Sequence, residues 1–550
     1  MLSFLSLVAV ASASTCTPTY NSRPTAIIDS GPIIGTTTQI GIPSATAIVN
    51  KYLGIPFAEK PERFRLPKPV KPWEDFLDAS RYGPACYQQI SDTTAQFYEG
   101  LGLGVVPNGE SEDCLNLNVY TPSTASAGSK AVLVWIYGGS WQNGANSLPL
   151  YDGSKISAKQ DVVLVSFNYR TNVFGFPADE SIPLEERNLA LHDTRLALDW
   201  VQRNIAYLGG DPRRVTIVGE SGGSSTVDTL LTAPPDPLTF HAAIMTSSQI
   251  SVPASPQKPP AYIAAWTALA ELAGCPDVDA AFDCLSEYPA QDLVNLVTNN
   301  SISFNGFPDG GITWADNPRL DRLAGRIARV PVLIGTTADE ASPFVIGLNN
   351  TRAALTSIDL GDYADLIIQA YPLGTPGILT ENARINRIAT EFLMQCNTQV
   401  HANDTKRAGL DSWRFYYNAS FPNTDFIPGI GAYHASEVSS FFGTYRQEAA
   451  TPFQAEVSST LQAAYANFAK NPSAGPGWPQ VPTVGIFGNG VRPGIKEEGL
   501  QALTTISSNI LDVRCPLYYS VYDGYSLIPW DEQLAAQNGT GPSSGTGLSF

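Results

Sequence analysis

The sequence predicts an α/β fold, in which one large domain is built on a central, mostly parallel sheet flanked by helices. Short, nearly continuous apolar runs recur along the chain, as in strands that are covered on both faces. Between two of these runs lies a helical pattern of apolar residues separated by charges. Strand, helix and strand at this spacing require right-handed crossovers and parallel pairing.

The predicted elements follow one another without an internal repeat or a linker long enough to separate domains. Residues 188–205 are predicted to form an amphipathic helix, because Leu189, Leu196, Trp200 and Val201 recur at helical spacing. The predicted strands are residues 131–137 (AVLVWIY), 162–167 (VVLVSF), 214–218, 242–246 and 331–335, and a further helix is predicted over 224–231.

The composition is that of a globular protein with a large core. Of the 550 residues, 43% are hydrophobic and 15% are charged. The formal net charge of −18 argues against nucleic acid or anionic lipid as a partner. An acidic surface is also common among soluble secreted proteins.

The N-terminus has the pattern of a secretory signal. An apolar run over residues 2–11 leads into Ala11-Ser12-Ala13, a small-x-small cleavage pattern, with no Lys or Arg before it. A buried first strand is the alternative interpretation. We expect a signal peptide over 1–13, a single domain over 14–550 and secretion. No other segment has the roughly 18 apolar residues of a membrane span, and the tail lacks a lipid-anchor signal, so we expect no stable membrane anchor.

Cysteines and glycosylation sequons fit an oxidising compartment. The chain has seven cysteines, none in the CxxC spacing of a zinc or redox site, so disulfides are expected. Cys275 and Cys284 bracket a short acidic loop and are natural partners, but the sequence leaves the pairing open. The odd cysteine is expected to be Cys16, beside the cleavage point. The candidate N-glycosylation sites are Asn299, Asn349, Asn403, Asn418 and Asn538.

One short motif, GESGG at residues 219–223, lies between a predicted strand and a predicted helix. It fits the G-x-S-x-G nucleophile elbow, in which a sharp turn exposes the hydroxyl of the serine, here Ser221. Side chains two positions either side of this serine would collide with neighbouring backbone. The following helix also points its positive end at the serine oxygen. A structural turn rich in small residues is the alternative, but the flanking strand and helix favour catalysis.

A catalytic serine needs a base, and the chain has only four histidines. His192 lies in a predicted helix and His241 opens a predicted strand, so both are interpreted as structural. His401 lies in a polar stretch, HANDTK, and is expected to be solvated. Proteins with this elbow have the order serine, acid, histidine, which leaves His401 and His434 and favours His434.

The acid that orients the base should follow a strand between the serine and the histidine. The strand predicted at 331–335 leads to two adjacent acids, Asp339 and Glu340, and both remain candidates because geometry cannot be read from the sequence. Asp309, in a Pro-Asp-Gly sequence, is a third acid in this interval and is interpreted as a turn residue.

Further motifs are spread nearly from end to end of the chain. They are YLGIPFA at 52–58, EDCLNLNVY at 112–120, the approach to the elbow at 204–212, ADE at 338–340 and GAYHASEVSSFFG at 431–443. Together they resemble the signatures of the type-B carboxylesterase/lipase family, the α/β hydrolases that include cholinesterases and secreted fungal lipases. The resemblance implies an α/β-hydrolase fold and hydrolysis of carboxylic esters.

The resemblance also implies the functional residues. The family's triad acid is the glutamate of the ADE segment, which selects Glu340 and implies the triad Ser221, Glu340 and His434. Its oxyanion hole uses backbone N–H groups of a Gly-Gly-Gly run and of the residue after the serine. The donors implied here are Gly139, Ser140 and Gly222, where relatives usually have glycine in place of Ser140 and alanine in place of Gly222. The implied disulfides are Cys86–Cys114, Cys275–Cys284 and Cys396–Cys515, with Cys16 unpaired, and the implied reaction needs no metal and no cofactor.

The segment between Cys86 and Cys114 resembles the loop that lines the active-site gorge in this family. Its apolar residues indicate either a flap over bulky acyl esters or a packed loop, and the two interpretations have equal weight. Cholinesterases use a tryptophan in this loop to bind a quaternary ammonium, and here the loop has none, so choline is not the expected substrate. The apolar residues are Phe97, Tyr98, Leu101, Leu103, Val105 and Val106.

We therefore expect a secreted serine carboxylesterase that acts on a small-molecule ester through an acyl-enzyme. A lipase or sterol esterase for long-chain acyl esters is an alternative, but it would need a longer lid than the Cys86–Cys114 loop provides. A catalytically silent binding protein is a second alternative, and such proteins typically lack a triad residue. The natural ester and the oligomeric state stay open.

Overall fold

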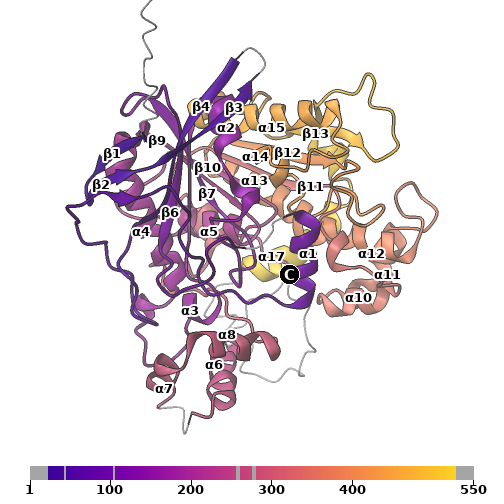
Figure 1. The fold of residues 1–550 in the computed structure, drawn as a ribbon. Coiled ribbons are helices and arrows are strands. Elements are labelled where there is room, and N and C mark those ends of the chain that lie inside the picture. Colours follow the sequence, from indigo (N-terminus) through magenta and orange to yellow (C-terminus); the bar gives the residue numbers. More distant parts are fainter. Residues whose placement is uncertain (1–22, 43–44, 103–105, 255–259, 276–279, 528–550) are drawn as a thin grey trace, which may run out of the picture.

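The computed structural model describes residues 23–42, 45–102, 106–254, 260–275 and 280–527 (Figure 1). The expected signal peptide at 1–13, Cys16 and the sequon at Asn538 lie outside these residues, as do Leu103 and Val105 of the gorge loop. Among the described helices, none is long and apolar enough to cross a membrane.

A sheet of eleven strands runs through the molecule, which confirms the predicted α/β class. Pairing is parallel from β8 across to β13, and antiparallel pairs lie at both edges. A smaller sheet contains β1 (Thr25–Ile28), β2 (Gly31–Ile34) and β5 (Leu77–Asp78). The strands of the large sheet, in spatial order, are β14 (Leu503–Ser507), β13 (Thr483–Val491), β12 (Ser412–Ala419), β11 (Val332–Thr337), β10 (Ala242–Thr246), β9 (Gly210–Glu220), β7 (Lys130–Ile136), β8 (Val163–Phe167), β6 (Asn116–Pro122), β4 (Ala45–Pro56) and β3 (Thr36–Ile42).

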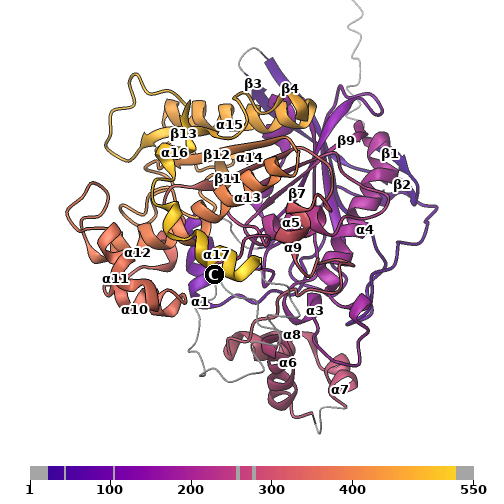
Figure 2. The same ribbon diagram turned by 180° about the vertical axis from the view of Figure 1, so that it is seen from behind.

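Helices cover both faces of this sheet (Figures 1 and 2). Helices α4, α5 and α13 pack on one face, and α2 and α15 pack on the other. The strands between them are apolar on both sides, and every residue of β8, β10 and β11 is buried. The helices are α1 (Asp92–Leu101), α2 (Ser154–Gln160), α3 (Asn172–Gly175), α4 (Leu189–Asn204), α5 (Gly222–Thr232), α6 (Pro260–Leu272), α7 (Ala281–Glu287), α8 (Ala290–Asn299), α9 (Pro318–Leu323), α10 (Thr351–Ser357), α11 (Ala364–Ala370), α12 (Glu381–Thr390), α13 (Cys396–Arg407), α14 (Val438–Phe442), α15 (Pro452–Lys470), α16 (Ser508–Leu511) and α17 (Tyr519–Ser526).

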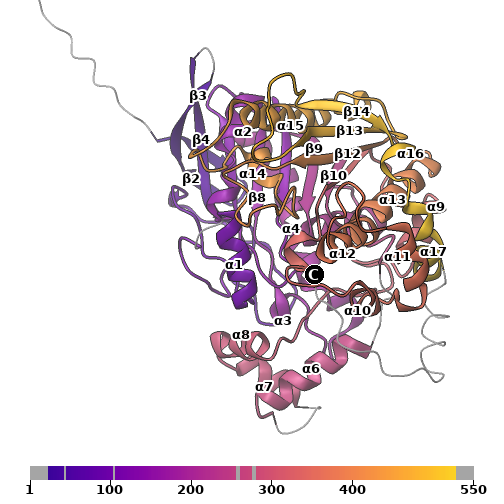
Figure 3. The same cartoon turned by 90° about the vertical axis from the view of Figure 1, so that its right-hand side faces the viewer.

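A second group of helices lies at one end of the sheet. Helices α6, α7 and α8 and helices α10 to α12 lie at the same end of the molecule as α1 (Figures 1 and 3). The loops that follow β7, β9, β10, β11 and β12 leave the sheet at a shared edge, because these neighbouring strands are parallel. This edge is where the predicted site residues meet.

The structure contains three disulfides, Cys86–Cys114, Cys275–Cys284 and Cys396–Cys515. These are the pairs that the family resemblance implies. The longest closes a loop of 119 residues and joins the start of α13 to the segment before α17.

His401 corrects a prediction made from the sequence. The polar stretch around it belongs to α13, and its side chain is fully buried instead of solvated. Its Nε2 lies 3.1 Å from Oδ1 of Asp228 in α5, and the guanidinium of Arg322 in α9 donates to the same oxygen. A polar sequence pattern does not reveal this arrangement, because the three ionisable side chains lie on three different helices.

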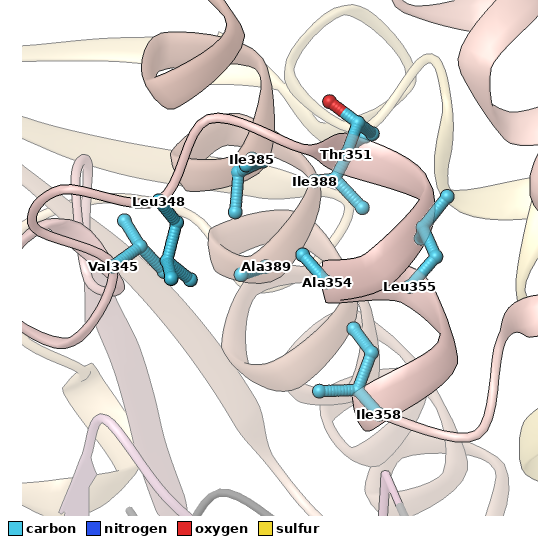
Figure 4. Close-up of a pocket in the computed structure, with 9 residues that line it drawn as sticks. All are labelled: Val345, Leu348, Thr351, Ala354, Leu355, Ile358, Ile385, Ile388 and Ala389. Carbon is cyan, nitrogen blue, oxygen red and sulfur yellow. The ribbon is translucent and has the colours of Figure 1, made fainter.

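A small apolar gap lies between α10 and α12 (Figure 4). Side chains of both helices line it, together with Val345 and Leu348 from the segment before α10. Its volume is about 20 Å³, enough for a group the size of a water molecule or a methyl. We interpret it as a packing defect and not as a ligand site.

Candidate active site

Ser221 lies at the sharp turn between β9 and α5. Its backbone has φ 52° and ψ −124°, a conformation that non-glycine residues rarely adopt. A Cβ on Gly219 would lie 2.2 Å from the Gly223 carbonyl oxygen, and a Cβ on Gly223 would lie 2.0 Å from that of Ile136. Both glycines are therefore required by close backbone contacts, as the elbow motif predicts.

Glu340 and His434 are in direct contact, although 94 residues separate them. His434 Nδ1 lies 2.7 Å from Glu340 Oε2. The other carboxylate oxygen, Oε1, accepts hydrogen bonds from Ser247 Oγ at 2.6 Å and from the Thr337 backbone N–H at 2.7 Å. Glu340 follows β11 and Ser247 follows β10, so the ends of two neighbouring strands hold the carboxylate in place.

The alternative acid, Asp339, has a different set of partners. Its Oδ2 accepts hydrogen bonds from the Ala432 backbone N–H and from Arg492 Nη2, each at 2.9 Å. Asp339 thereby holds the segment that carries His434, and a Cβ on Gly431 would collide with its carboxylate. Asp309 accepts hydrogen bonds from the backbone N–H groups of Thr313 and Trp314, as a turn residue does.

The other histidines lie away from this site. His192 lies in α4, and His241 is an exposed residue immediately before β10. His401 lies in the buried charge cluster with Asp228 and Arg322.

Two further carboxylates lie beside His434. Glu220 Oε1 is 3.3 Å from His434 Nε2, within ion-pair distance, and both side chains are buried. Burial raises the pKa of Glu220 to about 7, against the opposing effect of His434, and Glu340 adds to the increase. Burial, Glu220 and Glu340 likewise raise the pKa of Glu437 well above its usual range.

These carboxylates outweigh the desolvation of the imidazole. Burial lowers the pKa of His434, but Glu220, Glu340 and, with the smallest contribution, Glu437 together raise it to about 9. The protonation of His434 is therefore tied to that of its buried acidic neighbours.

The loop after β7 packs directly against the elbow. A Cβ on Gly138 would lie 2.8 Å from Ser221 Cβ, and Ser140 and Trp141 have φ values of 53° and 60°. A methyl group on Gly222 would lie 3.1 Å from the Ser140 nitrogen and 3.2 Å from the Trp141 nitrogen. The backbone of this loop therefore lies directly against the first residue of α5, beside Ser221.

Side-chain contacts fix the position of this loop. Trp141 Nε1 donates to Thr226 Oγ1 on α5 at 2.8 Å, and the Asn172 backbone N–H donates to the Trp141 carbonyl at 2.7 Å. These two hydrogen bonds hold the loop against α5 and the segment after β8.

Ser221 and His434 line a common cavity of about 810 Å³, a volume suited to a small ligand. Helix α1, within the Cys86–Cys114 loop, forms part of its wall through Phe97, Tyr98 and Leu101. The loop therefore lines the cavity, as the family resemblance implies. Among the described residues, no group of three or more His, Cys, Asp or Glu side chains is arranged to hold a metal ion.

Sequence reasoning missed Glu220, Glu437, Ser247 and Trp141. Glu220 was visible as the one acidic residue in GESGG, and Glu437 follows His434 by three residues. The sequence held no signal for Ser247, which contacts Glu340 only because β10 and β11 are neighbours in the sheet.

A nucleophile elbow at the carboxyl edge of an eleven-stranded, helix-covered sheet defines the fold of an α/β hydrolase. Comparison with known proteins gives the family within that class. The model of the carboxylesterase family matches residues 22–485. The chain belongs to the carboxylesterase family, and it is an enzyme that hydrolyses carboxylic esters.

Characterised relatives support this assignment. The chain is 32% identical over 471 residues to acetylcholinesterase of Bungarus fasciatus, a match that covers 79% of this chain and 77% of that protein. It is 33% identical over 466 residues to para-nitrobenzyl esterase of Bacillus subtilis, covering 80% and 90%. Acetylcholinesterase of Electrophorus electricus is 37% identical over 323 residues, covering 56% of this chain and 50% of that enzyme.

Proposed function

We propose that this protein is a secreted serine carboxylesterase that uses Ser221 as nucleophile, His434 as base and Glu340 as the orienting acid. The observation that carries the proposal is the 2.7 Å contact between His434 Nδ1 and Glu340 Oε2, at the wall of a cavity that Ser221 also lines. The strained elbow and the family membership support the same assignment.

The proposed reaction follows from this geometry. His434 Nε2 takes the proton of Ser221 as its oxygen attacks the ester carbonyl, and Glu340 stabilises the imidazolium through Nδ1. Backbone N–H groups of Gly139, Ser140 and Gly222 hold the developing oxyanion. Losing one such donor typically costs roughly 3 kcal/mol of barrier. His434 then protonates the leaving alcohol, and water releases the acid from the acyl-enzyme by the same steps.

A panel of p-nitrophenyl esters of increasing chain length tests the proposal, with wild type and Ser221→Ala compared. We expect hydrolysis by wild type, loss of nearly all activity in Ser221→Ala, and an organophosphate adduct on Ser221 identified by mass spectrometry. Absence of both hydrolysis and adduct would favour the alternative of a silent binding protein.

A lipase that acts on long-chain acyl esters is a second candidate. Ile346 and Ile427 line the cavity and are 55% and 38% exposed, so the cavity has an apolar rim. Activity that rises sharply above the solubility limit of the substrate would favour the lipase, whereas saturation below that limit favours the carboxylesterase.

We also propose secretion, cleavage of the 1–13 signal peptide, and N-glycosylation. Asn299 and Asn349 are exposed, whereas Asn403 and Asn418 are half-buried within α13 and β12. Asn299 and Asn349 are therefore the favoured glycan sites among the described sequons. Intact and deglycosylated masses of protein recovered from the culture medium test all three expectations.

A further inference from the structure

The cavity beside Ser221 is almost uncharged. Among the described residues that line it, only Glu220 and His434 carry ionisable acidic or basic side chains, and both lie at the proposed catalytic centre. A cationic or anionic substrate would find no opposite charge elsewhere on the described walls. The cavity is thus suited to a neutral ester.

One wall of the cavity is polar. It consists of Thr298, Ser301, Ser303 and Asn305, from the end of α8 and the loop that follows. Two glutamines that also line the cavity hold this loop in place. Gln89 Nε2 donates to the Val297 and Ile302 carbonyls, and Gln142 Nε2 donates to the Phe304 carbonyl at 2.6 Å and to Asn305 Oδ1 at 3.0 Å.

The polar groups of this wall remain available to a ligand. Within the described part of the chain, the hydroxyl of Ser303 and the Nδ2 of Asn305 make no hydrogen bond. Because Gln142 already occupies the Oδ1 of Asn305, its amide nitrogen is the group left to donate.

The wall beside His434 is aromatic. The Phe344 ring lies 5.6 Å from the His434 ring, and the Phe97 ring lies 6.0 Å from Phe344 and 6.3 Å from Tyr433. Phe426 also lines the cavity and packs edge-on against Tyr433. These rings offer apolar faces beside His434, while Ser91, Thr94 and Gln96 of the same loop as Phe97 line the cavity elsewhere.

The proposed chemistry decides which half of an ester meets which wall. The leaving alcohol must lie against His434, which protonates it, and hence beside Phe344 and Phe97. The carbonyl oxygen must point to the loop after β7. The acyl group then extends away from His434, toward the polar wall that Gln142 ties to that loop.

We propose that the site selects uncharged esters whose acyl group carries hydroxyl groups and whose alcohol is aromatic or otherwise apolar. This inference rests on the proposed function for its orientation of the ester. The chemical requirement is a neutral hydroxylated acyl group that hydrogen-bonds to Ser303 and Asn305.

A matched pair of esters tests the inference: benzyl 3-hydroxybutanoate and benzyl 3-methylbutanoate, which differ by hydroxyl against methyl at one position. We expect kcat/KM of wild type to be about 3- to 10-fold higher for the hydroxy ester, from one or two hydrogen bonds. Benzyl hydrogen succinate, an anionic analogue, should be a poorer substrate than either.

Substitutions in the polar wall test whether the preference for the hydroxy ester arises from Ser303 and Asn305. The double variant Ser303→Ala/Asn305→Ala removes both ligand-facing groups, while Gln142 keeps its hydrogen bonds to the Ser140 and Phe304 carbonyls. It should bring the ratio near 1 by lowering kcat/KM for the hydroxy ester. Asn295→Ala, at an exposed position on α8 outside the cavity, makes the same truncation of an asparagine and should keep the ratio. Ser301 is left unchanged because it belongs to the Asn299 sequon.

Binding of both esters to Ser221→Ala by calorimetry separates recognition from chemistry. A preference for the methyl ester, or a hydroxyl preference that survives in the double variant, overturns the inference. Tighter binding of the hydroxy ester to Ser221→Ala, with no hydrolysis by wild type, supports the inference and contradicts the proposed function. No hydrolysis and equal binding contradict both.

Discussion

At the scale of single residues, the proposed chemistry depends on a few side chains, and their neighbours set its conditions. Ser221 adopts a strained backbone conformation at the turn, and Glu340 is held by Ser247 and Thr337 while it contacts His434. Glu220, next to the serine in sequence, faces His434 Nε2 from the other side. The imidazole therefore lies between two carboxylates, and its charge state depends on both.

This arrangement predicts the pH dependence of the reaction. A protonated His434 cannot accept the proton of Ser221, so kcat/KM should rise with pH as His434, whose pKa is raised to about 9, loses its proton. Replacing Glu220 by glutamine removes a carboxylate that raises this pKa. Glu220→Gln should therefore lower the pKa of His434 and move the acidic limb of the profile to lower pH by roughly one unit or more.

The profile of kcat/KM against pH for wild type and Glu220→Gln measures this shift. Glu437→Gln is the matched control and should move the limb in the same direction by less, because Glu437 makes the smallest of the named contributions to the pKa of His434. A limb that stays in place or moves to higher pH in Glu220→Gln would contradict the prediction.

A second residue-scale prediction concerns Gly222 and Ser140. A methyl on Gly222 would crowd the nitrogens of Ser140 and Trp141 at 3.1 and 3.2 Å, and Ser140 at φ 53° has little freedom to retreat. Gly222→Ala should lower kcat about 10-fold, a fraction of the cost of losing an oxyanion donor outright. Ser140→Gly frees the loop, so the double variant should recover most of this loss.

The four kcat values of this double-mutant cycle measure the coupling between the two positions. Strictly additive effects would show that the two positions do not share a contact. Gly223→Ala is the structural control: its Cβ would lie 2.0 Å from the Ile136 carbonyl, so it should fail to fold instead of losing activity selectively.

At the scale of elements, α5 links the proposed nucleophile, Ser221, to α9 and α13. Helix α5 starts at Gly222 and carries Asp228, seven residues after Ser221. Asp228 forms a cluster with Arg322 and His401, and all three side chains are fully buried. Asp228 Oδ2 also accepts hydrogen bonds from the backbone N–H groups of Ile250 and Ser251. The loop that carries Ser247 is thereby anchored to the same helix as Ser221.

Breaking this cluster should cost stability. Arg322→Met leaves the charge of Asp228 uncompensated in the interior, which typically costs about 3–5 kcal/mol. Arg326→Met, four residues on, removes an exposed pair with Asp321 and should cost about 1 kcal/mol or less. Urea unfolding followed by tryptophan fluorescence gives the unfolding midpoint of each variant. Equal midpoints would show that the buried cluster stabilises the protein no more than the exposed ion pair does.

At the scale of the whole molecule, disulfides join segments that lie far apart along the chain. Cys396–Cys515 closes a loop of 119 residues, whereas Cys275–Cys284 closes one of nine. In the chain-entropy model, the disulfide that closes the longer loop removes more conformational entropy from the unfolded chain and therefore stabilises the fold more. The long disulfide fixes α13, and with it His401 of the buried cluster, to the C-terminal part of the fold.

Removing each bridge by paired Cys→Ala substitution should reveal this difference. The chain-entropy model gives a loss of about 5 kcal/mol for Cys396–Cys515 and about 3 kcal/mol for Cys275–Cys284. Thermal midpoints of the two double variants against wild type check the order. If removing Cys275–Cys284 lowers the thermal midpoint more than removing Cys396–Cys515, the stabilisation by these disulfides comes mainly from packing in the native state and not from the entropy of the unfolded chain.

Much of the molecule was readable from local patterns. Apolar runs located β7 to β11 to within a few residues, because strands covered on both faces are largely apolar. The exception is Pro212 to Arg214 in β9, which are half-buried or exposed. GESGG located the elbow, because its glycines are required by contacts within the turn itself. The order of the motifs along the chain left His401 and His434 and favoured His434. The acid could be narrowed to Asp339 and Glu340, and family motifs were needed to choose between these two.

The side-chain contacts within the site could not be predicted from local patterns, because they depend on the packing of strands and helices that are distant in sequence. Glu340 contacts His434 and Asp339 does not, because adjacent side chains at a strand end point in different directions, and only the neighbouring strands determine which one meets the imidazole. His401 is buried because α13 packs on α5 and α9, although its own sequence is polar. The polar and aromatic walls of the cavity come from four separate segments. Local sequence specifies each element through its own periodicity and turns, but a site built from several elements exists only where their packing brings the side chains together.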